Sequence, residues 1–159
     1  MGNVNMSIQS IEWDEGFNPL KDPFLAGVPI CGFQSVVIRK VRRVLRQRTI
    51  DDSLTRWIEC GVDVYKAAVL CDRIYHLTAS WANWPNQYYY PDDNARILLC
   101  YIPGLGVELN DVVRPLFKMY GVDVRYIYKE VSVDLHELCC NKGLKMRELL
   151  AVVDRARGL

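Results

Sequence analysis

The chain lacks the sequence patterns of membrane spans and secretory signals. Its longest apolar runs, at residues 97–102 and 149–153, are far shorter than the roughly 18 residues that a membrane-spanning helix needs. The amino-terminal residues contain no basic stretch followed by an apolar one, so no secretory signal is predicted. We therefore expect a soluble, cytoplasmic protein without a transmembrane segment.

Histidine is scarce, and the cysteines show none of the spacings of a metal centre. The chain has two histidines and six cysteines, and it contains no CxxC pair. His136 and Cys139 are spaced to lie side by side on a helix, next to Cys140, but these residues do not complete the four ligands of a zinc site. We expect no bound metal. The cysteines should be reduced and should mostly fill small apolar positions in the core, as at Cys60 and Cys71.

Complete cofactor and catalytic motifs are also missing. The turn Pro103–Gly106 lies between a predicted strand and a predicted helix, where glycines let backbone amides approach a phosphate. It lacks the third glycine of a dinucleotide fingerprint and the Lys-Ser/Thr pair of a P-loop, so we interpret it as a tight turn. No local motif marks a nucleophile with its base. The sequence predicts a protein that is not an enzyme and holds no cofactor.

What the chain does contain is a cationic helix. Residues 34–48 place their apolar side chains on one side at about 100° per residue, and no acidic residue stands among the basic ones. The apolar side comprises Val37, Ile38, Val41, Val44 and Leu45. The opposite side carries Arg39, Lys40, Arg42, Arg43 and Arg46. Because the formal net charge of the whole chain is only +1, this cationic face is a local feature.

The length and composition predict one globular domain with an amino-terminal arm. Residues 1–32 are rich in turn-forming residues with isolated apolar anchors, and we expect them to pack on the domain of residues 33–159. After the cationic helix, residues 49–80 keep helical spacing, with a break or kink at Gly61. A helical hairpin of residues 34–48 with residues 49–80 is the simplest packing.

The carboxyl-terminal half predicts a small sheet. The apolar run at 96–102 and the alternating segment at 122–133 are typical of strands, and the helix expected between them runs from Asn110 or Asp111 to Tyr120. Strand, helix and strand in this order favour a parallel βαβ unit. Residues 144–157 predict a closing helix. The predicted fold class is α+β: a helical amino-terminal half, a small sheet with a βαβ unit, and carboxyl-terminal helices.

Aromatic residues gather in the segment 81–94, which proline prevents from continuing the preceding helix. Its rings belong to Trp81, Trp84, Tyr88, Tyr89 and Tyr90. Exposed rings beside a cationic helix could stack on nucleic-acid bases. The alternative, which we favour for the group as a whole, is that the rings close the core or form an interface. Trp84 and Tyr88 are the candidates for stacking.

These features lead to a first hypothesis, a non-enzymatic nucleic-acid-binding protein of low sequence specificity, with RNA preferred over DNA. The arginine-rich face would hold phosphates. The predicted binding residues are Arg39, Lys40, Arg42, Arg43, Arg46, Trp84 and Tyr88. The alternative for the cationic face is an ordinary surface that the fold partly neutralises with Asp51, Asp52, Asp92 and Asp93.

A second hypothesis is a self-associating scaffold or adaptor, such as a small matrix-like or viral accessory protein. Its aromatic segment would form the contact between copies, and its cationic face would meet an acidic protein or an anionic membrane surface. The sequence contains no residue pattern that decides between the two hypotheses.

Overall fold

The part of the chain that the structure describes is helical. The computed structural model describes residues 10–11, 30–80, 82–99, 109–122 and 144–157. The helices within these ranges are α1 (Ile30–Arg46), α2 (Ile50–Glu59), α3 (Val64–Leu77), α4 (Ala95–Leu98), α5 (Leu109–Met119) and α8 (Met146–Arg157). Across these ranges no β-strand is formed, and the only pairing of that kind is an isolated antiparallel bridge between Asn94 and Lys145. The α+β prediction with its βαβ unit is therefore wrong.

The predicted strand at 96–102 begins instead as one turn of helix. The Asn94 side chain accepts a hydrogen bond from the Ile97 backbone N–H at 3.1 Å, and this cap starts α4. All residues of α4 are buried. A short apolar run that is buried on every side has the same composition in a helix and in a strand, so local periodicity could not separate the two. Residues 123–133 of the second predicted strand lie outside the described residues.

The break predicted at Gly61 is confirmed. Gly61 has a φ of +78°, a conformation that glycine adopts without steric cost, and it separates α2 from α3. Thr49 caps α2 by accepting a hydrogen bond from the Asp52 N–H at 3.2 Å. Asp63 caps α3 by accepting from the Tyr65 N–H at 2.9 Å. Side-chain caps at both starts thus fix a sharp corner between the two helices.

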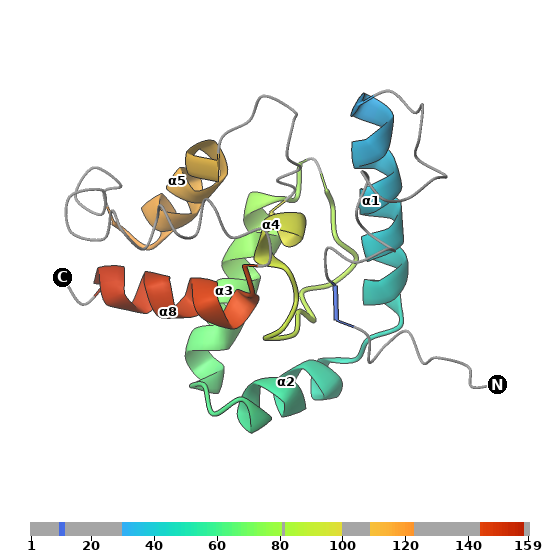
Figure 1. The fold of residues 1–159 in the computed structure, drawn as a ribbon. Coiled ribbons are helices and arrows are strands. Elements are labelled where there is room, and N and C mark those ends of the chain that lie inside the picture. Colours follow the sequence, from blue (N-terminus) through green and yellow to red (C-terminus); the bar gives the residue numbers. More distant parts are fainter. Residues whose placement is uncertain (1–9, 12–29, 81, 100–108, 123–143, 158–159) are drawn as a thin grey trace.

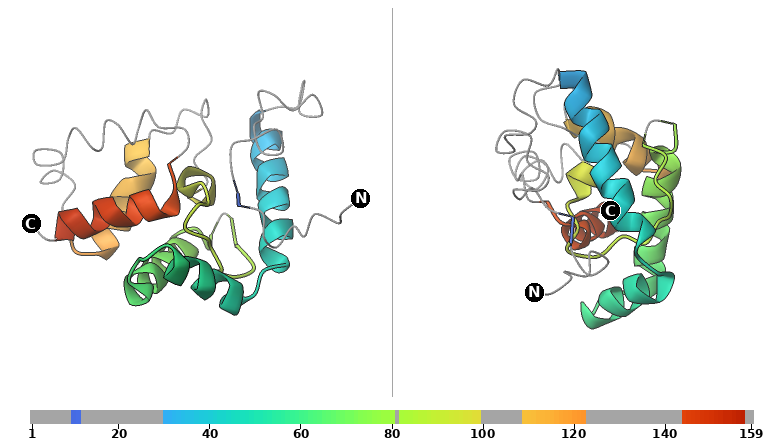
Figure 2. Two further views of the ribbon diagram at one scale, coloured as in Figure 1. Left: turned by 60° about the horizontal axis from the view of Figure 1, so that its bottom comes forward. Right: turned by 90° about the vertical axis from the view of Figure 1, so that its right-hand side faces the viewer.

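The central helix of the described fold is α3. It packs against α2, α5 and α8, and Figure 1 shows α5 and α8 on the side of the molecule opposite to α1. The segment 82–94 runs between α1 and α8 in Figure 1 and in the left view of Figure 2. The hairpin expected between the cationic helix and residues 49–80 is replaced by packing of α1 on this segment.

The closing helix predicted for residues 144–157 is confirmed. It is α8, and its residues Met146, Leu149, Leu150 and Val153 are buried. The helix predicted from Asn110 or Asp111 to Tyr120 is α5, and Gly121, at a φ of +74°, follows its end. Of the arm predicted for residues 1–32 the structure describes Ser10, Ile11 and residues 30–32, and these last three already belong to α1, which begins at Ile30. None of the helices in the described ranges is long and apolar enough to cross a bilayer.

Candidate nucleic-acid interface

The outer side of α1 carries an exposed arginine stripe, which we define as Arg39, Arg43 and Arg46. Spacings of four and then three residues place these side chains in one row along the helix. Val41, Val44 and Leu45 on the inner side are at most 1% exposed. The amphipathic helix predicted for residues 34–48 is confirmed over residues 38–46, but it ends at Arg46 instead of Arg48. The side chains of residues 34–37 lie outside the described residues.

Arg42 differs from the arginine stripe because its guanidinium is engaged with the backbone. Its Nε donates a hydrogen bond to the carbonyl oxygen of Ala82 at 2.9 Å, and a terminal nitrogen donates to the same oxygen. The Asn86 side-chain amide adds a second tie by donating to the Leu45 carbonyl at 2.7 Å. Arg42 is half-buried, as is Lys40. Arg42 therefore fixes α1 to the segment 82–94, and its hydrogen-bonding capacity is partly used.

The positive charge of the arginine stripe is not neutralised by an ion pair within the described part of the fold. None of the carboxylates described there forms an ion pair with Arg39, Arg43 or Arg46. Asp92 lies 3.0 Å from Arg147 Nε and 3.6 Å from Lys145 Nζ. Two of the carboxylates expected to neutralise the cationic face are thus committed elsewhere, because Asp93 also has its own partner, Arg48.

Arg48 belongs to the same basic run but lies in the core. After α1 ends at Arg46, the chain turns inward, and Arg48 is 3% exposed. Its Nη1 lies 2.6 Å from Asp93 Oδ2 and its Nη2 lies 2.9 Å from Oδ1, so the pair is joined by two parallel hydrogen bonds. Nη1 also donates to the Tyr88 carbonyl at 3.0 Å.

Asp93 links three separate parts of the chain. Its Oδ1 accepts a hydrogen bond from the Ile11 N–H at 2.8 Å, and its Oδ2 accepts one from the Tyr90 N–H at 2.7 Å. The neighbouring Asn94 N–H donates to the Ile11 carbonyl at 2.6 Å. Asp93 thus bonds the backbone and pairs with Arg48, which is not one of the residues of the cationic face that it was expected to neutralise. The sequence contains no local signal that pairs residues so far apart.

Trp84 lies in the core and presents no ring face for stacking. It is 1% exposed, and its indole Nε1 donates to the Leu98 carbonyl at 2.9 Å. Tyr89 is fully buried, and its carbonyl accepts hydrogen bonds from Ser53 Oγ at 2.7 Å and from Trp57 Nε1 at 2.9 Å. The general interpretation of these rings as core is thus correct for Trp84 and Tyr89. Trp81 lies outside the described residues.

Tyr88 belongs to a different surface from the arginine stripe. It is half-buried and lines a groove of about 60 Å³ between α2 and α3, together with Ile50 and Leu54. The structure therefore gathers Arg39, Arg43 and Arg46, and leaves both predicted stacking residues apart from them.

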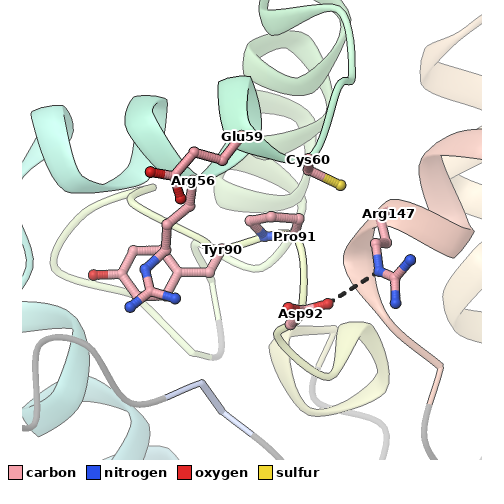
Figure 3. A pocket seen from close by; sticks show the side chains of 7 residues that line it. All are labelled: Arg56, Glu59, Cys60, Tyr90, Pro91, Asp92 and Arg147. Atoms are coloured by element: carbon pink, nitrogen blue, oxygen red, sulfur yellow. Dashed lines mark hydrogen bonds and ion pairs between the residues drawn. The ribbon is translucent and has the colours of Figure 1, made fainter.

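A second cavity, of about 260 Å³, lies between α2, α8 and the segment 90–92 (Figure 3). The Arg56 guanidinium stacks over the Tyr90 ring at 4.3 Å from its centre, and Arg48 contacts the same ring at 3.6 Å. On the other side Arg147 is directed at Asp92. Cationic and anionic groups alternate around this cavity, and within the described ranges no three metal-binding side chains come together. The cavity therefore has no strong preference for one sign of ligand charge.

The described cysteines lie in different environments, and the described histidine is exposed. Cys71 in α3 is buried, as predicted, and burial raises the pKa of its thiol. Cys60 is exposed at the end of α2, so its assignment to the core was wrong. His76 is exposed and lies 3.2 Å from Asp72. The turn at 103–106 and the residues His136, Cys139 and Cys140 lie outside the described residues.

Comparisons with known proteins give no independent guide to this site. No protein-family model, no curated protein and no solved structure matches the chain. Its function is therefore inferred from the geometry of the described residues.

Proposed function

We propose that this protein binds the phosphate backbone of nucleic acids through the arginine stripe. The observation that carries the proposal is the row of exposed guanidinium groups on the outer side of α1, without a carboxylate partner in the described structure. Guanidinium groups make paired hydrogen bonds to phosphate oxygens, and their charge displaces counterions from a polyanion.

The spacing of the arginine stripe suits a phosphate backbone. Arg39 and Arg46 are seven residues apart, which corresponds to about 10 Å along a helix that rises 1.5 Å per residue. Nucleic-acid strands carry one negative charge every few ångströms along their length, so the row meets more than one phosphate at a time. The helix is also held in place by the Arg42 and Asn86 hydrogen bonds, which limits the entropy lost on binding.

Phosphate contacts carry no sequence information by themselves, so sequence specificity should be low. The preference for RNA in the first hypothesis depended on ring stacking. Trp84 is buried and Tyr88 lines another surface. RNA and DNA share the phosphate chemistry, and the binding experiment has to compare them directly.

The test is fluorescence anisotropy with labelled single-stranded and duplex RNA and DNA at several salt concentrations. The proteins are the wild type and the double variant Arg39→Gln/Arg43→Gln. If the three arginines each contact a phosphate, the logarithm of the affinity for duplex DNA should fall against the logarithm of salt with a slope of about −2.7. Each substitution should weaken binding and reduce this slope by about 1.

A matched control is available on α5. Arg114 and Lys118 are both exposed and four residues apart, as are Arg39 and Arg43, so Arg114→Gln/Lys118→Gln removes the same charge with the same spacing. The control variant should bind nearly as well as the wild type. Equal loss in both variants would mean a diffuse charge effect, and no binding by the wild type at low salt would reject the proposal.

The alternative of a self-associating scaffold used the aromatic segment as its contact. Trp84 and Tyr89 are buried in the core and cannot form that contact, while Tyr88 is half-buried and Trp81 lies outside the described residues.

A further inference from the structure

The outer side of α2 exposes more apolar surface than a solvated helix normally does. Ile50 is 54% exposed and Ile58 is 62% exposed, with the half-buried Leu54 between them. Spacings of four residues place the three side chains in one row, which we call the α2 apolar stripe. The inner side of the helix is already filled by Ser53 and Trp57, which are buried. The α2 apolar stripe is therefore not needed to pack α2 on the core of this protein.

The α2 apolar stripe borders the groove between α2 and α3. Ile50 and Leu54 form one wall of this groove, and Val64 and Ala68 of α3 form the other. Its volume of about 60 Å³ is several times the space that one water molecule needs. A single aliphatic side chain from a partner can be accommodated there, next to the exposed isoleucines.

The charges around the stripe are acidic. Asp51, Glu59 and Asp63 are exposed at the two ends of α2 and in the turn that follows. The nearby basic residues are directed elsewhere, because Lys66 Nζ lies 2.9 Å from Asp154 and the Arg56 guanidinium lies over Tyr90. An apolar row with an acidic border is complementary to an amphipathic helix that has lysine or arginine beside its apolar side.

We infer that the α2 apolar stripe and its groove form a docking site for a basic amphipathic helix of a partner protein. A second copy of this chain is a poorer occupant. Two α2 helices packed antiparallel about a two-fold axis would bring the same edge of each helix together, so Asp51 of one copy would lie opposite Glu59 of the other and the two carboxylates would repel. The three side chains of the stripe also cover much less than the roughly 800 Å² that each partner buries in a standard interface. A single bound helix needs only a few anchor side chains.

The site consists of residues of α2 and α3, whereas the arginine stripe lies on α1, so it adds a protein-binding function to the proposed nucleic-acid binding. A test can use two synthetic 18-residue helical probes with leucine at helical spacing, one with lysine and the other with glutamate at the remaining positions. Fluorescein-labelled probes are titrated with the full chain, and anisotropy is measured. Both probes are titrated with the Arg39→Gln/Arg43→Gln variant, in which the cationic row that could hold the anionic probe is weakened. The lysine probe should bind this variant and the glutamate probe should not.

Variants locate the binding to the stripe. Ile50→Ser/Ile58→Ser should weaken binding of the lysine probe by about tenfold or more, and Asp51→Asn/Glu59→Gln should weaken it by a smaller factor. All four side chains are exposed, so circular dichroism should show an unchanged fold. Tyr65→Ser is the matched control, because Tyr65 is 78% exposed but outside the stripe, and it should leave binding unchanged.

Three results would overturn the inference. One is equal binding of the two probes, which would remove the charge argument. Another is binding that persists in Ile50→Ser/Ile58→Ser. The last is a mass that rises with protein concentration in light scattering and falls to that of the monomer in Ile50→Ser/Ile58→Ser, since a second copy would then occupy the stripe. Arg39→Gln/Arg43→Gln should bind the lysine probe like the wild type, which keeps this test independent of the nucleic-acid proposal.

Discussion

Proteins bind nucleic acids with arginines, as in the arginine stripe on α1, and with aromatic rings, as in the segment 84–94. In this protein the two regions lie in opposite environments. The arginine stripe is exposed and makes no ion pair with the described carboxylates. The segment 84–94 is largely buried, and its backbone and side chains are joined to α1, to α2 and to Ile11. Residue type alone therefore does not decide exposure. What decides it is whether the fold supplies partners for the polar groups that go inside.

Arg46 and Arg48 show the same contrast at a distance of two residues. Arg46 ends α1 on the exposed side, where a positive charge also interacts favourably with the carboxyl end of the helix. Arg48 follows the helix end and enters the core, where Asp93 meets its guanidinium with two hydrogen bonds. A buried cation is tolerated only with such a partner.

The largest expected effect on stability comes from replacing Asp93, which holds the buried segment 84–94 together. Asp93→Ala leaves the Arg48 guanidinium without its carboxylate and the N–H groups of Ile11 and Tyr90 without an acceptor. We expect a loss of about 3–5 kcal/mol in the free energy of unfolding, measured by urea denaturation. Asp92→Ala, at the half-exposed neighbour, is the control and should cost less than about 1 kcal/mol. Similar losses in the two variants would contradict the central role of Asp93.

Trp84→Ala should also unfold the protein more easily, because it removes a large core side chain and leaves the Leu98 carbonyl without its indole donor. The expected loss is again about 3–5 kcal/mol in the free energy of unfolding, at or below that of Asp93→Ala. If instead Trp84→Ala kept its stability and lost RNA binding, the ring would be at the interface and the comparison would fail.

A pH titration probes a partly buried ring outside the segment 84–94. Burial raises the pKa of Tyr120 to about 12, while Arg73 and Arg157 near its ring oppose this shift. The raised value means that the folded state favours the neutral phenol. Its contribution to stability is full below the ordinary tyrosine pKa of about 10 and is lost as the pH rises towards 12. Absorbance at 295 nm should show a step near pH 12 that Tyr120→Phe removes.

The smallest effect on stability is expected on the exposed side. Arg39→Gln/Arg43→Gln should change the free energy of unfolding by no more than about 0.5 kcal/mol, because these side chains form no described ion pair. The same variant should lose most of its affinity for nucleic acid. A large loss of stability would show that the arginine stripe supports the fold, and the contrast with the buried segment 84–94 would then be wrong.

Several elements could be predicted because their signals are local. The cationic helix follows from the 3.6-residue period, the corner at Gly61 from a residue that tolerates positive φ, and the inner face of α8 from its apolar spacing. The start of α4 could not, because Asn94 acts as its cap only once Ile97 adopts helical geometry. The α2 apolar stripe could have been predicted from the sequence. Ile50, Leu54 and Ile58 make the apolar side of the helix wider than the side that Ser53 and Trp57 bury in the core.

The sequence by itself determined which residues of α1 face outward, because the helical period places Arg39, Arg43 and Arg46 opposite Val41, Val44 and Leu45. Only the tertiary structure decided the fate of Arg42, Arg48 and Trp84. Their partners are a carbonyl at Ala82, a carboxylate at Asp93 and a carbonyl at Leu98. Long-range partners leave no periodic trace in the sequence, because the contact exists only after the separate segments have packed and water has been excluded.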